Sequence, residues 1–320
     1  MLYLELFNAI SSISLKVMKS IVIFGGSGFV GKYLIRRLCK RGFRIIVPYQ
    51  QSTNEAKLRQ LGVTGQVIPY YFKSLNNDER LKSILLKSDV CLNLKTSWDQ
   101  KKETFKNSIF KFNKNLTLIL KNNKRLEHYI FFSGLGLNPK SKSIRDNAIL
   151  KSEVEINKNL KNSIIIRPGV IIGGGDKFLK RLVPLFKISY FIPLFGNKNI
   201  RFQPVFIDDV SLVVDRIISE KVSGNHIFEL AGPSIFKYED FYNNISKYLN
   251  KSRILINIPV KLSKLLIWFL EKIPNFPINI EQLQLMQRDS VKEGIDKDFS
   301  FFEIIPQNTL LILKKSIFKN

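Results

Sequence analysis

The stretch SIVIFGGSGFVG, residues 20–31, decides the fold of this chain. Its apolar first half ends at a glycine, as a buried parallel strand does. The apolar spacing of Val30, Leu34 and Leu38 then predicts a helix over residues 28–40. Between strand and helix, the glycines match both G-x-x-G-x-x-G and G-x-G-x-x-G. A glycine turn in this position is typical of a site for the pyrophosphate of a dinucleotide.

The glycines of this turn have different physical tasks. The early ones permit a tight turn and let the backbone approach the pyrophosphate, and Gly31 lets the helix pack closely on the strand. Free N–H groups and the helix dipole favour the phosphates. An ordinary glycine-rich turn without a ligand is the alternative, and the location directly after a strand disfavours it. We expect NAD(H) or NADP(H) to contact Gly25, Ser27, Gly28, Phe29, Val30 and Gly31.

The choice between the two cofactors depends on the end of the second strand. About twenty residues after the turn, NAD-binding chains carry an acidic residue that binds the 2′-hydroxyl of the adenine ribose. Residues 47–51 are VPYQQ, without Asp or Glu, and Gln50 is the residue we expect at the ribose. The missing acid removes a repulsion against a 2′-phosphate and tilts the expectation towards NADP(H), although Gln can bind either form.

Strand and helix patterns alternate through the first half of the chain. Strands are expected at residues 20–24, 44–47, 66–69, 89–94, 128–133 and 163–167. Helices are expected at residues 28–40, 77–86, 101–122 and 147–160. Repeated βα units of this length imply an α/β fold with a Rossmann-type, doubly wound parallel sheet. We place this nucleotide-binding domain at residues 18–168.

The pattern changes after Pro168. Three consecutive glycines and several prolines divide the chain into short pieces. Short strands and helices are expected in turn at residues 203–207, 208–218, 226–230 and 238–249. These features predict a smaller, mixed C-terminal lobe over residues 169–320, interleaved with the last strands of the sheet and laid over its carboxyl edge.

The chain is strongly basic. Among 320 residues, 51 Lys and Arg oppose 26 Asp and Glu, which gives a formal net charge of +25. Part of this excess belongs to a composition rich in Lys, Asn, Ile and Phe. The remainder favours an anionic partner, such as a phosphorylated cofactor, an acidic protein surface or an anionic membrane. No nucleic-acid-binding signature accompanies the charge, so no nucleic acid partner is expected.

The cysteines and the N-terminal residues indicate the cellular compartment in which the protein folds. Cys39 and Cys91 are each inside an apolar element, which indicates buried thiols in a reducing compartment, and without a C-x-x-C pair no structural zinc is expected. Residues 1–17 lack the basic segment of a signal peptide. They are either a translated N-terminal extension or the result of a start codon that was assigned too early, before Met18. No stretch of about 18 uncharged apolar residues predicts a membrane span. We expect a cytoplasmic protein.

Residues 260–273, VKLSKLLIWFLEKI, form a second distinctive segment. Lysines flank an apolar side of the predicted helix that is made by Leu262, Leu265, Leu266, Phe269 and Leu270. The favoured interpretation is an amphipathic helix packed on its own protein. The alternative is a surface helix that lies in a membrane interface or in the groove of a partner.

Several motifs together carry a family resemblance. The glycine turn, Asn93-Leu94, Ser133 and Lys151 resemble the extended and atypical short-chain dehydrogenase/reductase superfamily, which includes NAD-dependent epimerases and dehydratases. A closer resemblance covers nearly the whole chain. Its most specific stretches are Gly-x-x-Asp-Lys-Phe-Leu at 173–179 and QPVFIDDV at 203–210. The chain is similar to the dinucleotide-binding accessory subunit of respiratory complex I (NADH:ubiquinone oxidoreductase) and its bacterial relatives.

The resemblance implies roles for individual residues. Asn93 and Leu94 would lie beside the adenosine, where the family often has a glycine in place of Lys95. The nicotinamide would be surrounded by Ser133, Lys151 and Pro168. The family member in complex I is thought to hold NADPH as a structural cofactor. The implied partners are complex I subunits and the anionic membrane surface, with a peripheral location on the cytoplasmic face of a bacterial inner membrane.

The residues for ordinary dehydrogenase chemistry are incomplete. Active members of the superfamily use Tyr-x-x-x-Lys, in which the tyrosine passes a proton and the lysine lowers its pKa. Lys151 matches the lysine, but Asn147 stands where the tyrosine is expected. An amide has no ionisable proton, so the ordinary mechanism is expected to be absent, with Ser133 and Lys151 as its remnants. Asp208 and Asp209 are expected to cap a helix and not to form an acid/base pair.

Three functions stay open at this point. The first is an NAD(P)(H)-binding accessory protein of the complex I type, with a structural cofactor. The second is an active NAD(P)-dependent epimerase, dehydratase or reductase with a rearranged acid. The third is a soluble regulator that senses NAD(P)H. Asn147 separates the second from the others, and membrane association separates the first from the third.

Overall fold

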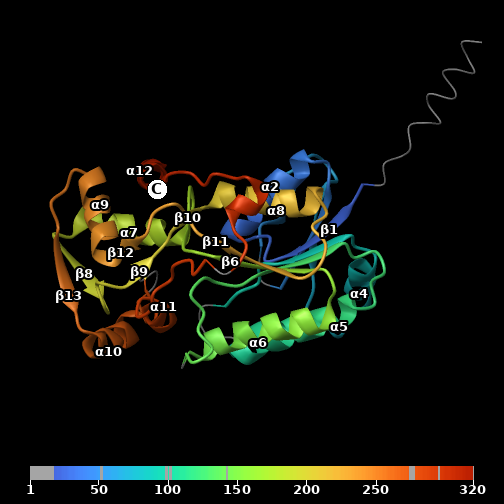
Figure 1. Cartoon of the computed structure of the whole chain (residues 1–320), viewed down its shortest axis with the longest axis horizontal. Helices are drawn as coiled ribbons and strands as arrows, with labels where there is room; N and C mark the ends of the chain where they lie inside the picture. The colour runs from blue at the N-terminus through green and yellow to red at the C-terminus, as the bar shows by residue number, and fades with distance from the viewer. Residues whose placement is uncertain are drawn as a thin grey trace, which may run out of the picture.

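The computed structural model describes residues 18–50, 53–97, 100, 103–141, 143–273, 278–294 and 296–319. Its centre is a seven-stranded, wholly parallel sheet with the strand order β11-β6-β5-β4-β1-β2-β3 (Figure 1). The strands are β1 (Ser20–Phe24), β2 (Arg44–Tyr49), β3 (Val67–Tyr71), β4 (Val90–Asn93), β5 (His128–Phe132), β6 (Ser163–Pro168) and β11 (His226–Leu230). The predicted doubly wound parallel sheet is confirmed. The extension predicted at residues 1–17 lies outside the described residues.

Helices cover both faces of this sheet (Figure 1). One face carries α2 (Phe29–Lys40), α3 (Glu55–Arg59) and α8 (Ile207–Ser219). The other face carries α4 (Glu79–Leu86), the π-helix η1 (Lys106–Lys111), α5 (Phe112–Leu120) and α6 (Ile144–Asn159). Alternate residues of β1 point to opposite faces, so Ile21 and Ile23 join the first core and Val22 and Phe24 the second.

A third apolar core lies in the C-terminal part of the chain. It is built mainly from α7 (Lys177–Ile188), β8 (Phe191–Phe195), α9 (Tyr238–Tyr248), α11 (Ile280–Leu285) and α12 (Thr309–Lys319). The parallel pair of β8 and β13 (Ile254–Ile258), followed by α10 (Val260–Leu270), forms the end of the molecule away from β1 (Figure 1). The boundary at residue 168 stays a prediction, because α8 and β11 return from this part of the chain to the main sheet.

Short pairs connect the two parts of the chain. β7 (Ile171–Ile172) pairs with β10 (Val205–Phe206), and β9 (Arg201–Phe202) pairs with β12 (Phe236–Lys237). The single strand expected at 203–207 is therefore wrong in detail, since two short strands flank Pro204, which has no N–H to donate to a ladder. The 3-10 helix η2 (Phe299–Phe302) packs on the main sheet, where Phe302 stacks on Phe228.

Two further expectations meet the structure here. Cys39 and Cys91 are both buried free thiols, as predicted. The helix expected over 101–122 is wrong in its extent, because the described structure begins as η1 at Lys106 and continues as α5 to Leu120. In the described part of the chain, no helix combines the length and the apolar character needed to cross a bilayer.

Candidate dinucleotide-binding site

The glycine turn connects β1 to α2 at the point where the strand order reverses between β1 and β4. In doubly wound sheets, ligands bind at the carboxyl ends of the strands beside this reversal. Gly25 has φ +75°, and its carbonyl accepts a hydrogen bond from the Gly28 N–H at 3.0 Å. A Cβ atom at Gly25 would lie 2.9 Å from the carbonyl carbon of Leu94, so the turn is pressed against the end of β4. The turn therefore has the location and tightness that the sequence predicted.

The start of α2 is open to an anion. Gly28 is the N-cap, no side chain caps the helix, and the first turn contains no acidic residue. The first N–H groups of the helix, at Phe29, Val30 and Gly31, therefore have no partner within the helix. Together with the helix dipole, these donors favour a phosphate. The side chain of Phe29 packs edge-on against Tyr33 with ring centroids 5.4 Å apart.

Gly31 holds the helix close to the strand. A Cβ atom at this position would lie 2.5 Å from both the Cα and the carbonyl oxygen of Gly26. Gly31→Ala is therefore expected to destabilise the whole fold by about 1–3 kcal/mol through overpacking. Chemical denaturation of the variant and the parent protein measures this loss. An unchanged midpoint of unfolding would show that the helix can move away from the turn at no cost.

The end of β4 forms one wall of the candidate site. Asn93 is fully buried, its amide donates to the side chain of Asn113 at 2.8 Å, and its carbonyl accepts from the backbone N–H of Lys95 at 2.9 Å. The N–H of Leu94 donates to the carbonyl of Phe24. These bonds fix the backbone of residues 93–95 beside the glycine turn.

Gln50 and Lys95 meet at the expected ribose end of the site. Lys95 Nζ donates to Gln50 Oε1 at 2.8 Å and lies 4.1 Å from the centroid of the Phe112 ring. Burial lowers the pKa of Lys95, and Glu103 opposes that shift. Among the described residues, no carboxylate is within ion-pair distance of this ammonium group. Within the described part of the chain, Lys95 is thus a lysine without a directly bonded carboxylate beside the end of β2, where residues 47–51 have no acidic residue.

The residues expected around the nicotinamide lie at the ends of β5 and β6 and on α6. The Ser133 hydroxyl donates to Glu153, whose carboxylate binds Arg167 at 2.7 Å. Asn147 and Lys151 are one helical turn apart on α6, and the Asn147 amide donates to the carbonyl of Ser141 at 3.1 Å. Within the described residues, Lys151 makes no hydrogen bond or ion pair. Ser133 is therefore already bonded, and Lys151 remains free for ribose hydroxyl groups.

Comparisons with known proteins show which family this chain resembles. Residues 21–159 match the model of the "NAD dependent epimerase/dehydratase family". This region of the chain is similar to that family. The solved dTDP-glucose 4,6-dehydratase DesIV of Streptomyces venezuelae has the same fold, with a TM-score of 0.68, 13% identity and coverage of 94% of this chain and 96% of the other.

Curated relatives extend the similarity to most of the chain. "NADH dehydrogenase [ubiquinone] 1 alpha subcomplex subunit 9, mitochondrial" of Arabidopsis thaliana is 25% identical over 89% of this chain and 73% of its own length. The "NADH-ubiquinone oxidoreductase 40 kDa subunit, mitochondrial" of Neurospora crassa is 22% identical over 89% of this chain and 75% of its own length. The predicted resemblance to the epimerase/dehydratase group and to complex I subunits is confirmed.

A late segment of the chain lies over the loop that follows β5. Ser290 Oγ donates to the carbonyl of Leu135 at 3.2 Å, and a Cβ at Gly136 would lie 2.5 Å from the carbonyl oxygen of Asp289. Arg288 forms an ion pair of 2.7 Å with Asp146 at the start of α6. Residues 288–290 therefore cover the chain next to Ser133 and Asn147.

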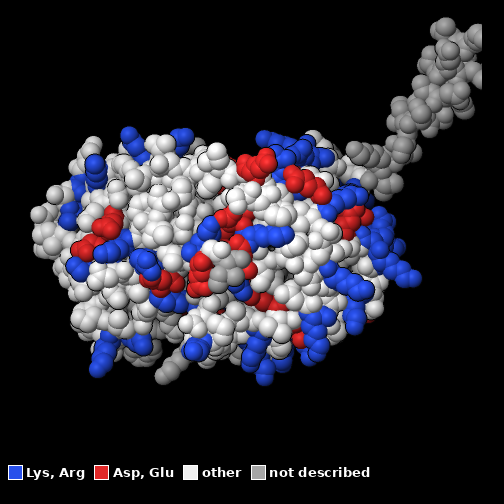
Figure 2. Space-filling view, viewed as in Figure 1, with Lys and Arg blue, Asp and Glu red and all other residues white. Residues whose placement is uncertain are grey.

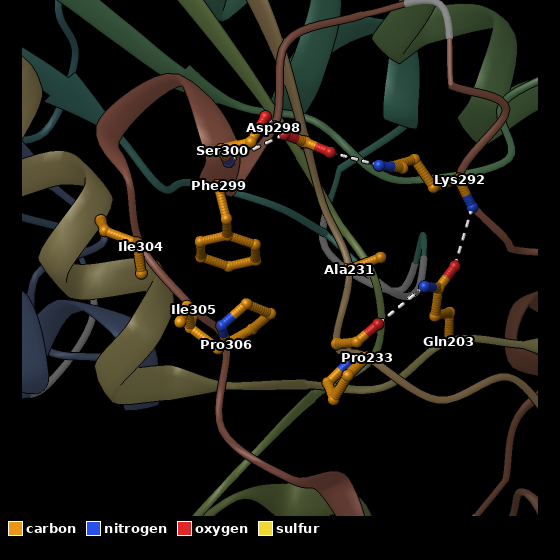
Figure 3. Close-up of a pocket in the computed structure, with 11 residues that line it drawn as sticks. Gln203, Ala231, Pro233, Lys292, Asp298, Phe299, Ser300, Ile304, Ile305 and Pro306 are labelled. Carbon is orange, nitrogen blue, oxygen red and sulfur yellow. Dashed lines mark hydrogen bonds and ion pairs between the residues drawn. The ribbon is translucent and has the colours of Figure 1, made fainter.

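Two cavities of the described structure lie away from the glycine turn. The larger, about 280 Å³, lies beyond the end of β11 and is lined by residues such as Gln203, Pro233 and Phe299 (Figure 3). Its polar groups bind one another: the Gln203 amide donates to Gly232, and Lys292 pairs with Asp298. The smaller, about 200 Å³, is at His128, at the amino end of β5. Neither offers a set of free polar groups beside Ser133.

Acidic residues of the C-terminal part have structural tasks. Asp176 caps α7 and accepts from the N–H of Leu179 at 2.7 Å, as expected for a residue after three glycines. The prediction that Asp208 and Asp209 cap α8 is wrong, because both lie within its first turn. Asp209 instead accepts the N–H of Gln307 at 2.8 Å and ties the chain before α12 to α8.

Asp176 predicts a pH dependence of stability. Burial raises its pKa to about 6, against about 3.9 in an unfolded chain. Because the folded pKa is the higher one, the stability from this group is fully present below pH about 4 and is lost as the pH rises through 6. Asp176→Asn keeps an acceptor for the cap but cannot ionise. Between pH about 4 and 7, the parent protein should lose about 1–3 kcal/mol relative to this variant. Parallel pH profiles of the two unfolding free energies would refute the assignment.

Proposed function

We propose that the chain is an accessory subunit of the complex I type that holds NADP(H) as a structural cofactor and does not turn it over. The observation that carries the proposal is the state of the expected catalytic residues. Asn147 cannot supply a proton, and the Ser133 hydroxyl is bonded to Glu153. Lys151 is available to bind ribose, and the open start of α2 is available to bind phosphate.

The proposed cofactor residues form three groups. Gly25, Ser27, Gly28, Phe29, Val30 and Gly31 would hold the pyrophosphate, because their backbone forms the open helix start. Asn93 and Leu94 would support the adenosine, and Lys151 and Pro168 the nicotinamide end. When bound, the dinucleotide would supply a hydride-carrying ring, and this chain offers no proton donor of the family type to accompany it.

The preference for NADP(H) rests on Lys95. A partly buried ammonium with Gln50 as its hydrogen-bond partner favours an added anion of suitable size. A 2′-phosphate carries nearly two negative charges and three acceptor oxygens, so it would neutralise the lysine and accept its protons. A carboxylate at this end of β2 would repel the phosphate, and the sequence has Gln50 there.

The proposed partners are complex I subunits and an anionic membrane. The similarity to the Arabidopsis and Neurospora subunits supports the first. The net charge of +25 supports the second, and Figure 2 shows Lys and Arg along much of the outline of the visible face. We therefore place the protein peripherally on the cytoplasmic face of a bacterial inner membrane.

Turnover assays with added NADPH test the absence of catalysis. We expect no oxidation of the cofactor with carbonyl compounds or nucleoside-diphosphate sugars, the substrate chemistry of the dehydratase neighbour. Asn147→Tyr should remain inactive, because Ser133 stays bonded to Glu153 and residues 288–290 still cover the adjacent loop. Turnover by the parent protein would instead support an active epimerase, dehydratase or reductase.

A further inference from the structure

An amphipathic helix that packs on its own protein buries its apolar side. The helix α10 instead exposes much of its apolar side to solvent. Its buried residues are Ser263 and Ile267, one helical turn apart. The residues opposite are exposed by 48% at Leu262, 55% at Leu265 and 55% at Phe269. The favoured prediction from the sequence, that this apolar side packs on its own protein, is therefore wrong for these three side chains.

Hydrogen bonds explain this orientation of α10. The Ser263 hydroxyl donates to the carbonyl of Ile258 at 2.8 Å and accepts the N–H of Gly196 at 3.1 Å. A buried hydroxyl needs such partners, so Ser263 fixes the start of the helix against the ends of β8 and β13. Ile267 then enters the third core beside it. Because 3.6 residues complete each turn, the side with Leu262, Leu265 and Phe269 points outward, whereas Leu266 and Leu270 still pack partly on this core.

Aromatic and basic side chains share the exposed face. Trp268 is 52% exposed, and Lys272 Nζ lies 4.1 Å from the centroid of its ring. Lys261 and Lys264 are also exposed on this helix, and Glu271 is the sole acidic residue in the segment 250–273, which has five basic ones. Tryptophan beside lysine, with leucines around them, is the composition of helices that lie in the headgroup region of a bilayer.

Exposed apolar side chains also stand on the strand pair next to the helix. In the register of β8 and β13, Phe191 stands opposite Ile254, and both are exposed. Ile256, two residues further along β13, points to the same side and is exposed as well. Figure 1 shows β8, β13 and α10 together at one end of the molecule. We call this surface, made by Phe191, Ile254, Ile256, Leu262, Leu265, Trp268 and Phe269, the apolar end.

We propose that the apolar end docks on an anionic lipid surface, with α10 lying in the membrane interface. A lipid surface fits better than a protein groove because the exposed apolar side chains stand on the outer side of a helix and are ringed by lysines. The positive lysine ammonium groups are complementary to the negative lipid phosphates. The aliphatic part of each lysine can extend to the headgroups while the leucines insert at the boundary with the acyl chains. This inference deepens the proposed membrane location and does not depend on the cofactor.

Vesicle binding of the full chain tests the proposal. The single-tryptophan variant Trp98→Phe leaves Trp268 as the reporter. With vesicles that contain phosphatidylglycerol, its emission should move to shorter wavelength and the protein should co-sediment, whereas vesicles of phosphatidylcholine alone should bind much less. Binding should weaken about fivefold for each lysine neutralised and should fall at high salt.

Matched variants locate the binding surface. Leu265→Glu with Phe269→Glu should weaken vesicle binding at least about tenfold. Leu311→Glu on α12, with an equally exposed leucine, should leave it unchanged. A protein that starts at Met18 should bind as well as the full chain, and weaker binding would assign the membrane contact to residues 1–17. The proposal would be overturned if the parent protein did not bind vesicles, or if the α10 double variant bound them as well as the parent. It would also be overturned if the parent protein were a dimer that the double variant dissociates. Retained binding of NADPH in the double variant separates this result from a failure of the cofactor site.

Discussion

Gly28→Leu is expected to weaken binding of NADPH and NADH at least about a hundredfold, or about 2.8 kcal/mol. Gly28 is the N-cap of α2, with φ −73° and ψ 178°, a conformation that any residue adopts. A Cβ atom there would meet the Gly25 carbonyl at 3.2 Å and otherwise enter open space at the start of the helix. The leucine should therefore cover the phosphate donors at the expense of a small local shift of the Gly25 carbonyl, with the rest of the fold retained. Isothermal calorimetry with each dinucleotide measures the loss.

Two controls separate a blocked site from a damaged fold. The melting temperature of Gly28→Leu should stay close to that of the parent protein without cofactor, unlike that of Gly31→Ala. Gly28→Ala should lose less affinity than the leucine variant, because a methyl group covers less of the helix start. Full affinity in Gly28→Leu would show that the pyrophosphate does not bind at this turn.

Lys95→Met should weaken NADPH binding about tenfold to a hundredfold and leave NADH binding nearly unchanged. The range corresponds to the loss of a charge-assisted hydrogen bond to a phosphate, about 1.5–3 kcal/mol. Methionine keeps the length of the side chain over Phe112 and removes the charge. Competition between the two cofactors for the purified protein measures the ratio directly.

The controls for Lys95→Met change or keep the charge at Lys73, Gln50 and Lys95 itself. Lys73→Met removes a lysine whose backbone carbonyl, and not its ammonium, contacts Gln50, so it should leave the ratio of affinities unchanged. Gln50→Glu should lower NADPH binding by placing a carboxylate beside the phosphate, and Lys95→Arg should preserve it. Equal losses of NADPH and NADH in Lys95→Met would show that the lysine supports the site without distinguishing the 2′ group.

The main sheet could be predicted because its signals are local. β1, the glycine turn and α2 follow one another within residues 20–40, and each has a pattern set by its own period or by glycine. The same holds for β5 and β6. Predictions were poorer where distant segments decide the structure: η1 interrupts the expected helix, and Pro204 separates β9 from β10.

The surroundings of the candidate site depend on contacts that a sequence pattern does not contain. Glu153 binds Ser133 from another element, and nothing in its local sequence shows this partner. Lys95 stands where the family often has a glycine, but its contact with Gln50 joins residues 45 positions apart. The cover by residues 288–290 depends on long-range folding in the same way. For α10, the hydrophobic pattern predicted the helix, and the hydrogen bonds of Ser263 determined which face is buried.

The most direct test of the central claim is to identify the dinucleotide that the protein retains. The purified, full-length protein is denatured, the released nucleotide is identified by chromatography and quantified against protein, and the intact protein is assayed for oxidation of the bound cofactor. We expect about one NADPH per chain that no added substrate oxidises. Protein that is empty as purified and that turns over free NAD(P)H would contradict it and would require another proton donor than Asn147.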